Sequence, residues 1–186
     1  MSLSQDLDLD KLRELLERTE ILDCIHRYTR GMDRLDRAMV RSAFHDDAID
    51  DHGGGFVGHI EAFLDWAFEF HASQVRHQHY VGNHSVELKG NEAHSETYYL
   101  FVGTDRLAGK PLFITGGRYI DRFEKRDGCW GIATRNCLVE WMTNWPADLP
   151  DEAVEFLKLH GTVSRDRSDT SYDRPLQIDQ ALLAAQ

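Results

Sequence analysis

The chain has 186 residues, of which 41% are hydrophobic and 28% charged, and a formal net charge of −11. This composition is typical of one soluble globular domain and excludes a disordered chain, and the acidic charge with scattered basic residues argues against nucleic acid as a partner. Because there is no apolar run of membrane-spanning length, no apolar signal core near Met1 and no paired spacing among the three cysteines, we expect no membrane association and a cytoplasmic location.

The N-terminal third of the sequence carries helical patterns. Residues 8–20 have leucines at helical spacing among many charges, and from Ile21 to Leu35 apolar residues recur every three to four positions. Asp36 precedes the apolar stretch 38–44 and suits the N-cap of a short helix. The stretch "DDAIDDHGGGF" then predicts a short strand that runs into a glycine loop, and residues 60–68 predict a third amphipathic helix.

After about residue 76 the composition becomes that of β-strands. Four segments, 78–88, 93–103, 111–124 and 129–141, are joined by hairpin turns at 89–92 and 126–128 and by a looser link at 104–110. Helices followed by a meander of strands predict an α+β fold, in which a curved antiparallel sheet packs on the N-terminal helices and leaves an internal cavity.

The sequence after Trp145 differs from the rest. We expect one domain over residues 1–145 and a C-terminal extension over residues 146–186. The extension has one amphipathic piece at 153–159, which predicts a short helix. The polar stretch that follows it is expected to lie extended on another surface, such as a subunit interface, or to be mobile.

The stretch "RHQHYVGNHSVEL", residues 76–88, holds three histidines within eight positions. Regular strand alternation would place His79 and His84 on opposite faces and leave His77 at the exposed start of the strand. A metal is one interpretation, because residues 50–52 add two aspartates and a histidine upstream. Transition-metal sites need three or four converging ligands, and the acidic run is more simply a solvated loop. We therefore expect no metal and no cofactor.

Several segments together resemble the SnoaL-like branch of the nuclear transport factor 2 superfamily. They cover about residues 10–142 and are "YTRGMDR" with "FHDDA", "FVGHIEAFLDW", "HQHYVGNHSVEL" and "GGRYIDRFEKRDGCWGI". The resemblance implies a cone-shaped α+β fold. The pattern is similar to those of scytalone dehydratase and hexachlorocyclohexane dehydrochlorinase, which eliminate a small molecule without cofactor or metal by means of an aspartate–histidine pair.

The resemblance implies that Asp33, in "GMD", and His79, in "QHYVGN", stand at the positions of that pair. Imidazole suits a general base because its pKa is about 6.5, and a carboxylate on one ring nitrogen fixes its tautomer. We therefore expect a lyase or isomerase in which Asp33 orients His79 and His79 removes a carbon-bound proton from a hydrophobic cyclic or aromatic substrate. Periodicity alone favours a solvated helix-end role for Asp33. The strand 93–103 lacks the second histidine of scytalone dehydratase, which argues against scytalone as substrate.

Seven other residues are expected near the cavity as substrate-binding groups, although core packing or solvent exposure is open for several. They are Tyr28, Phe44, Trp66, Tyr99, Phe101, Arg118 and Asn136. Tyr28, Arg118 and Asn136 would donate hydrogen bonds to a developing anion. The alternative function is a non-catalytic ligand-binding or assembly subunit that resembles the small subunit of a ring-hydroxylating dioxygenase. In either case an open sheet face predicts a homodimer or homotrimer.

Overall fold

The computed structural model describes residues 8–105, 112–145 and 162–177, and the helix expected at 153–159 lies outside this part of the chain. The elements, in chain order, are α1 (Leu9–Arg34), α2 (Arg37–Arg41), β1 (Phe44–Asp51), β2 (Val57–His59), α3 (Ile60–Ala72), β3 (Gln74–Lys89), β4 (Glu92–Asp105), β5 (Leu112–Arg126), β6 (Cys129–Trp145) and the short 3-10 helix η1 (Thr170–Tyr172).

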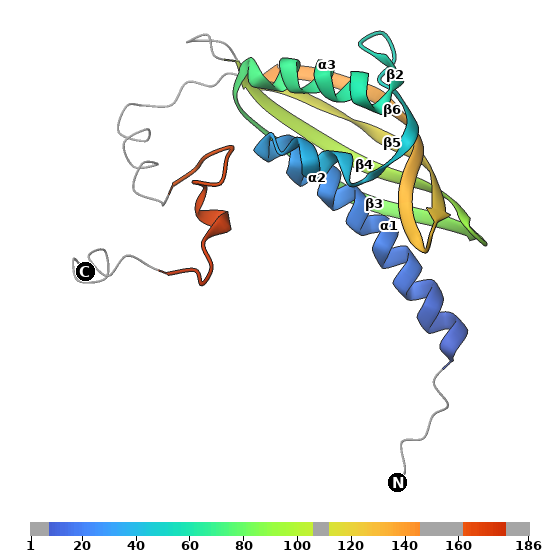
Figure 1. Cartoon of the computed structure of the whole chain (residues 1–186). Coiled ribbons are helices and arrows are strands. Elements are labelled where there is room, and N and C mark those ends of the chain that lie inside the picture. Colours follow the sequence, from blue (N-terminus) through green and yellow to red (C-terminus); the bar gives the residue numbers. More distant parts are fainter. Residues whose placement is uncertain (1–7, 106–111, 146–161, 178–186) are drawn as a thin grey trace.

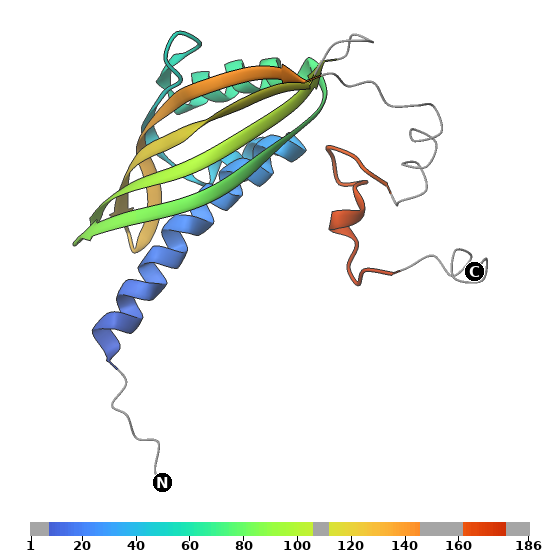
Figure 2. The ribbon, with the colours of Figure 1, turned by 180° about the vertical axis from the view of Figure 1, so that it is seen from behind.

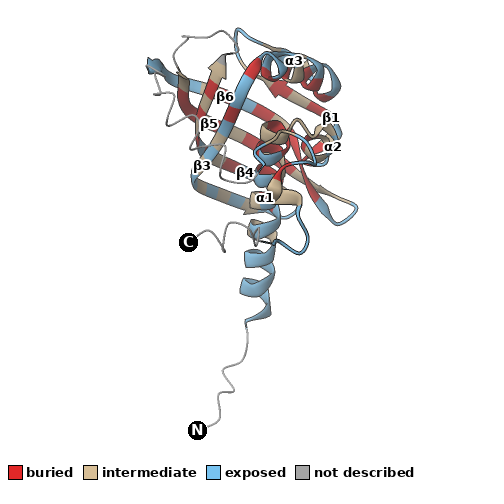
Figure 3. Ribbon diagram, turned by 90° about the vertical axis from the view of Figure 1, so that its left-hand side faces the viewer, coloured by how far each residue is buried: buried red, intermediate tan, exposed pale blue. Residues whose placement is uncertain are grey.

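The two helical patterns at the N-terminal end of the sequence form one continuous helix, α1, of 26 residues. Asp8 caps its start by accepting a hydrogen bond from the backbone N–H of Lys11, and Leu35 ends it in the left-handed conformation. The half that begins at Ile21 packs one face against the sheet, whereas the leucines of the first half are exposed on the part of the helix that projects from the body (Figure 3). No described helix is long and apolar enough to cross a membrane.

The strands form one curved sheet in the order β2-β1-β6-β5-β4-β3. The described neighbours pair antiparallel except β1 and β6, which run parallel. All three helices lie on the concave side of the sheet, and none of the described elements covers its other face (Figures 1 and 2). The expected α+β cone fold is therefore confirmed, and the core lies between the helices and the concave face.

A β-bulge on β3 corrects the expected distribution of histidines. Val81 pairs with Tyr99 on β4, whereas His84 pairs with Thr97, so three steps on β3 oppose two on β4. The extra residue reverses the alternation of faces. His79 and His84 consequently face the same, concave side, and the prediction of opposite faces was wrong.

A second bulge, on β6, decides which residues of the last strand face inward. The register to β5 shifts between Ile132 and Thr134, which again moves the alternation by one residue. Beyond this point Arg135 and Cys137 are buried on the concave side, while Asn136 is exposed. The alternation of residue types along the sequence gives no sign of this change of face.

Gly117 on β5 is required by the close approach of β6. A Cβ added there would lie 1.9 Å from the carbonyl oxygen of Leu138. Because that oxygen belongs to the backbone, we expect Gly117→Ala to lower the free energy of unfolding by about 1–3 kcal/mol through overpacking. Urea denaturation measures the change. Gly54→Ala is the control, since an added Cβ there meets nothing within 4 Å, and equal midpoints for the two variants would contradict the interpretation.

Candidate functional site

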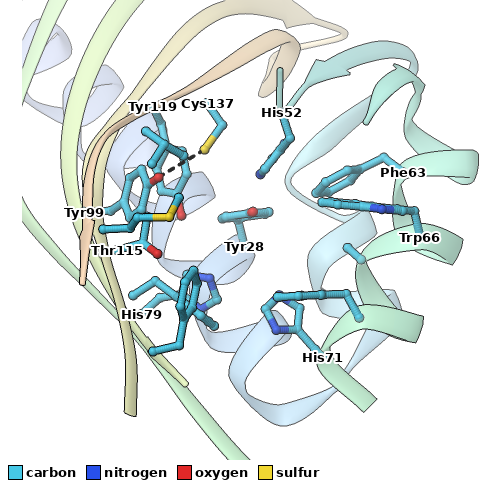
Figure 4. A pocket seen from close by; sticks show the side chains of 16 residues that line it. Tyr28, His52, Phe63, Trp66, His71, His79, Tyr99, Thr115, Tyr119 and Cys137 are labelled. Atoms are coloured by element: carbon cyan, nitrogen blue, oxygen red, sulfur yellow. Dashed lines mark hydrogen bonds between the residues drawn. The ribbon is translucent and has the colours of Figure 1, made fainter. Parts of the chain in front are cut away.

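A cavity of about 170 Å³ lies between the concave face of the sheet and helices α1 and α3 (Figure 4). Its lining is mainly aromatic and aliphatic. Phe70, Val139 and Met142 line the cavity and are also exposed, so they mark its mouth, whereas Tyr28 and Tyr119 lie at its buried end. An apolar cavity of about 150 Å³ holds a molecule the size of benzene, so this cavity suits a compact ring.

Asp33 and His79 meet at the wall of this cavity. The last turn of α1 brings Asp33 to β3, where its Oδ1 lies 2.7 Å from Nδ1 of His79. The backbone N–H of His79 also donates to both carboxylate oxygens, each at 3.1 Å. The carboxylate thus holds the proton on Nδ1 and leaves Nε2 of the cavity-lining ring as the acceptor, which is the tautomer that a general base needs.

Four of the seven expected binding residues line the cavity: Tyr28, Trp66, Tyr99 and Phe101. Phe44 is buried behind them and packs edge-on against Tyr28, with ring centroids 5.9 Å apart. It therefore supports a wall of the cavity and does not contact the space itself.

Arg118 and Asn136 do not reach the cavity. The side chain of Arg118 lies on the outer face of β5 and donates hydrogen bonds to Glu96 at 2.8 Å and Glu140 at 2.6 Å. Asn136 is turned outward by the bulge on β6. These placements contradict the expectation that both residues bind substrate.

The structure contains a second histidine–carboxylate pair in residues 50–52, where the sequence pattern predicts a solvated loop. Asp50 is fully buried on β1 between β2 and β6, and its Oδ1 accepts a hydrogen bond from Nδ1 of His52. His52 lines the cavity and stacks on Phe63 at 4.9 Å. Burial disfavours the charged ring, but hydrogen bonds to Asp50 and to the sulfur of Cys137 outweigh it and raise the pKa of His52 to about 9. The signal in the sequence was the Asp-x-His spacing, which puts both side chains on one strand face.

Arg135 lies beneath the buried end of the cavity. Its guanidinium donates two hydrogen bonds to Asp121, at 2.7 and 2.8 Å, and both side chains are fully buried. The same group stacks on Tyr28 and Tyr119, 4.1 and 4.3 Å from the ring centroids. Burial raises the pKa of both tyrosines, so their hydroxyls stay protonated and can donate hydrogen bonds.

Two neutral histidines lie beside His79. His77 was expected at the exposed start of a strand, which was wrong: β3 begins earlier, and the buried ring donates from Nε2 to the carbonyl of Met32 at 2.8 Å. It stacks on His71 with ring centroids 4.2 Å apart. Burial lowers the pKa of His77 to about 4 and that of His71 to about 2. Within the described residues, no group of three or more His, Cys, Asp or Glu side chains is placed to hold a metal ion.

Comparison with known proteins decides the family. The SnoaL-like domain family matches residues 13–136, more than half of the chain. The chain belongs to the SnoaL-like family. It is thereby a member of the nuclear transport factor 2 superfamily, as the resemblance of its motifs implied.

Solved structures share the fold of this SnoaL-like protein at low sequence identity. LinA is 21% identical over 75% of this chain and 98% of its own, with a TM-score of 0.69. The hexachlorocyclohexane dehydrochlorinase LinA-type3 from Novosphingobium barchaimii is 19% identical over 75% and 99%, with a TM-score of 0.65. A scytalone dehydratase-like protein from Novosphingobium aromaticivorans is 18% identical over 73% and 91%, with a TM-score of 0.65. Among curated protein sequences none matches the chain.

Residues 162–177 of the SnoaL-like protein lie beside the C-terminal end of α1 (Figure 1). Arg165 donates to the backbone carbonyl of His71 at 2.8 Å, and Asp169 forms an ion pair with Arg34 at 3.5 Å. This part of the polar stretch therefore contacts α1 and α3 next to the Asp33–His79 pair.

The buried histidines predict a maximum of stability at about pH 6.5. His71 and His77 bind protons there only after unfolding, because burial holds their pKa values at about 2 and about 4. The free energy of unfolding should therefore fall below about pH 6.5, by up to about 3 kcal/mol per pH unit. His52 acts in the opposite sense, since its pKa of about 9 gives the folded state an extra proton whose stabilisation is lost as the pH rises from about 6.5 to 9.

Urea denaturation across this pH range measures both limbs. His77→Gln is expected to make the acid limb less steep and to leave the alkaline limb unchanged, because it removes only one of the protons taken up on unfolding. A free energy of unfolding that does not vary with pH would contradict the assignment of these charges.

Proposed function

We propose that this SnoaL-like protein is a cofactor-independent lyase or isomerase that removes a carbon-bound proton from a small hydrophobic cyclic or aromatic molecule. The observation that carries the proposal is the 2.7 Å contact of Asp33 with His79 at the wall of an aromatic cavity. A general base and the group that orients it need contact of this kind, and the base must face the space that the substrate occupies.

In the proposed reaction, Nε2 of His79 accepts the proton and Asp33 stabilises the imidazolium that forms. The electron pair of the broken C–H bond becomes a C=C bond to the neighbouring carbon. In an elimination the leaving group departs with the electrons of its own bond; in an isomerisation the proton returns at another carbon. A positioned general base supplies about 10²–10⁴-fold of rate enhancement, and the apolar lining excludes water.

The comparisons place enzymes among the proteins that share this fold and leave the reaction and the substrate of this chain open. Proteins named as a dehydrochlorinase and as scytalone dehydratase-like share this fold. At identities of 18 to 21% the likeness shows the fold alone, so the argument for catalysis rests on the Asp33–His79 geometry in this chain.

The proposal is tested with a panel of small ring compounds that carry an acidic C–H bond next to a carbonyl, a hydroxyl or a halide. We expect turnover of at least one class by the purified protein without added cofactor, followed by product absorbance or mass. Asp33→Asn/His79→Gln should abolish it, whereas Arg118→Met, on the outer face, should not change it. Equal turnover by the wild type and the double variant would refute the proposal.

The outer face of the sheet favours a second candidate, an assembly subunit. One row of paired residues crosses the outer face from β3 to β6: Tyr80, Leu100, Gly116 and Trp141. The ring of Trp141 lies over Gly116, in the space that a Cβ of residue 116 would occupy. Tyr80 and Trp141 are about half exposed. Exposed apolar rows of this kind mark interfaces, so we propose association into a homodimer or homotrimer. Light scattering measures the mass, and co-purification with a larger subunit together with no turnover would favour the assembly function.

A further inference from the structure

The Asp50–His52 pair faces the Asp33–His79 pair across the cavity. His79 comes from β3 at one edge of the sheet, and His52 follows β1 near the other edge. In Figure 4 the two imidazoles approach from opposite sides with the Tyr28 ring between them. A ring bound in this space would have one histidine on each side.

The surroundings of Asp50 indicate why His52 is cationic. Asp50 is fully buried, and its Oδ2 has no hydrogen-bond partner among the described residues. A buried carboxylate with so few donors is costly unless a cation is paired with it. His52, whose Nδ1–H donates to the other carboxylate oxygen, is that cation. The rest of its ring lines the cavity, where it also hydrogen-bonds the sulfur of Cys137, the partner that a substrate oxygen would replace.

The groups that face His52 come from four elements. Asp50 comes from β1, on the same side of the cavity as His52. Cys137 comes from β6, Tyr28 from α1 and His71 from α3. Asp50 and Cys137 raise the pKa of His52 to about 9 and so favour its charged form. His71 is neutral, because burial lowers its pKa to about 2, and Tyr28 is neutral because burial raises its pKa. His52 is therefore placed to donate a proton, across the cavity from His79, the proposed base.

We propose that His52 is a second catalytic residue, which donates its proton to a substrate oxygen that gains negative charge while His79 removes the carbon-bound proton. This inference rests on the proposed function and narrows its substrate class. The substrate is a compact ring whose acidic C–H bond stands next to a carbonyl-bearing or hydroxyl-bearing carbon. A halide needs no proton to depart, so a cationic donor opposite the base favours oxygen chemistry.

The proton balance for loss of a hydroxyl group is as follows. The C–H electron pair becomes the C=C bond, the C–O electron pair goes to the oxygen, and that oxygen takes the proton of His52 and leaves as water. His79 has then gained one proton and His52 has lost one. Transfer of one proton from His79 to His52 through solvent restores the starting state.

The test uses para-nitrophenol, a single-ring ligand whose phenol and phenolate forms absorb at different wavelengths. If the oxygen of this ligand accepts a hydrogen bond from the cationic ring of His52, the negative charge of the phenolate is stabilised and the phenolate form binds more tightly than the phenol. We expect the ligand bound to the wild type to ionise about one pH unit below the free ligand, which is a preference of about tenfold for the phenolate. His52→Gln should remove this shift. His71→Gln, the same substitution at a neutral cavity histidine, and His79→Gln should both retain it.

Three outcomes would overturn the proposal: no binding by the wild type, the same ionisation in the wild type and His52→Gln, or a shift lost in His79→Gln instead. If His52→Gln does not fold, Asp50→Asn is titrated in its place and should also lose the shift, and nitrogen NMR of the wild type should show His52 doubly protonated at about pH 7.5. If no compound of the ring panel is turned over but the phenolate shift is intact, the proposed function is refuted together with the catalytic role of His52, and only the binding of an anionic oxygen at His52 stands.

Discussion

His79→Gln is expected to lower turnover of the ring substrate by about 10²–10⁴-fold, because the general base is removed. Glutamine can still reach Asp33 but cannot accept a proton from carbon. The loss should appear in kcat, with KM little changed, since the aromatic lining that binds the ring is intact. Steady-state kinetics with the substrate identified by the panel measures both values.

Asp33→Asn should approach the same loss, although it preserves the shape of the side chain. The carboxylate of Asp33 accepts the Nδ1–H of His79 at 2.7 Å, and a carboxamide neither fixes this tautomer nor balances the imidazolium. Because the two residues act as a unit, the double variant should be no slower than the slower single variant. A His79→Gln enzyme that keeps more than about a tenth of wild-type kcat would contradict the role of His79 as the base.

Arg135→Met is expected to lower the free energy of unfolding by about 3–5 kcal/mol. The substitution leaves the carboxylate of Asp121 fully buried without the two hydrogen bonds that it accepts at 2.7 and 2.8 Å. It also removes the cation between the rings of Tyr28 and Tyr119. Urea denaturation monitored by circular dichroism gives the value.

A double-mutant cycle separates the charge from the packing. Asp121→Leu added to Arg135→Met removes the unpaired carboxylate, so the double variant should be more stable than Arg135→Met alone. Arg118→Met breaks ion pairs on the outer face and should leave the midpoint unchanged, because exposed pairs contribute little. If Arg135→Met were as stable as Arg118→Met, the buried pair would not be a determinant of the fold.

Sequence reasoning located the helices and strands because their periodicities are strong. The apolar stripe from Ile21, the cap at Asp36 and the turn at 126–128 each appear where the pattern predicted them. The parallel pairing of β1 with β6 was not visible, because it joins segments some ninety residues apart and leaves no local signal.

The placement of the candidate site residues followed from the sequence only in part. Asp33 and His79 came from the resemblance of motifs, and the structure brings them into contact. Arg118 and Asn136 were misplaced, the latter because a bulge reverses the faces of β6, and a bulge leaves no mark in periodicity. His52 was missed because a histidine after acidic residues looks solvated, whereas β1 is an interior strand of the sheet.

Proton exchange at carbon tests the central claim most directly, because it requires only the base and a bound ring. Indanone, a small ketone with acidic C–H bonds, is incubated with the protein in deuterium oxide, and uptake of deuterium at the carbon next to the carbonyl is followed by NMR. The account predicts uptake catalysed by the wild type and by Arg118→Met, and reduced by at least about 10²-fold in both His79→Gln and Asp33→Asn. Uptake at the wild-type rate in either of these two variants would contradict it.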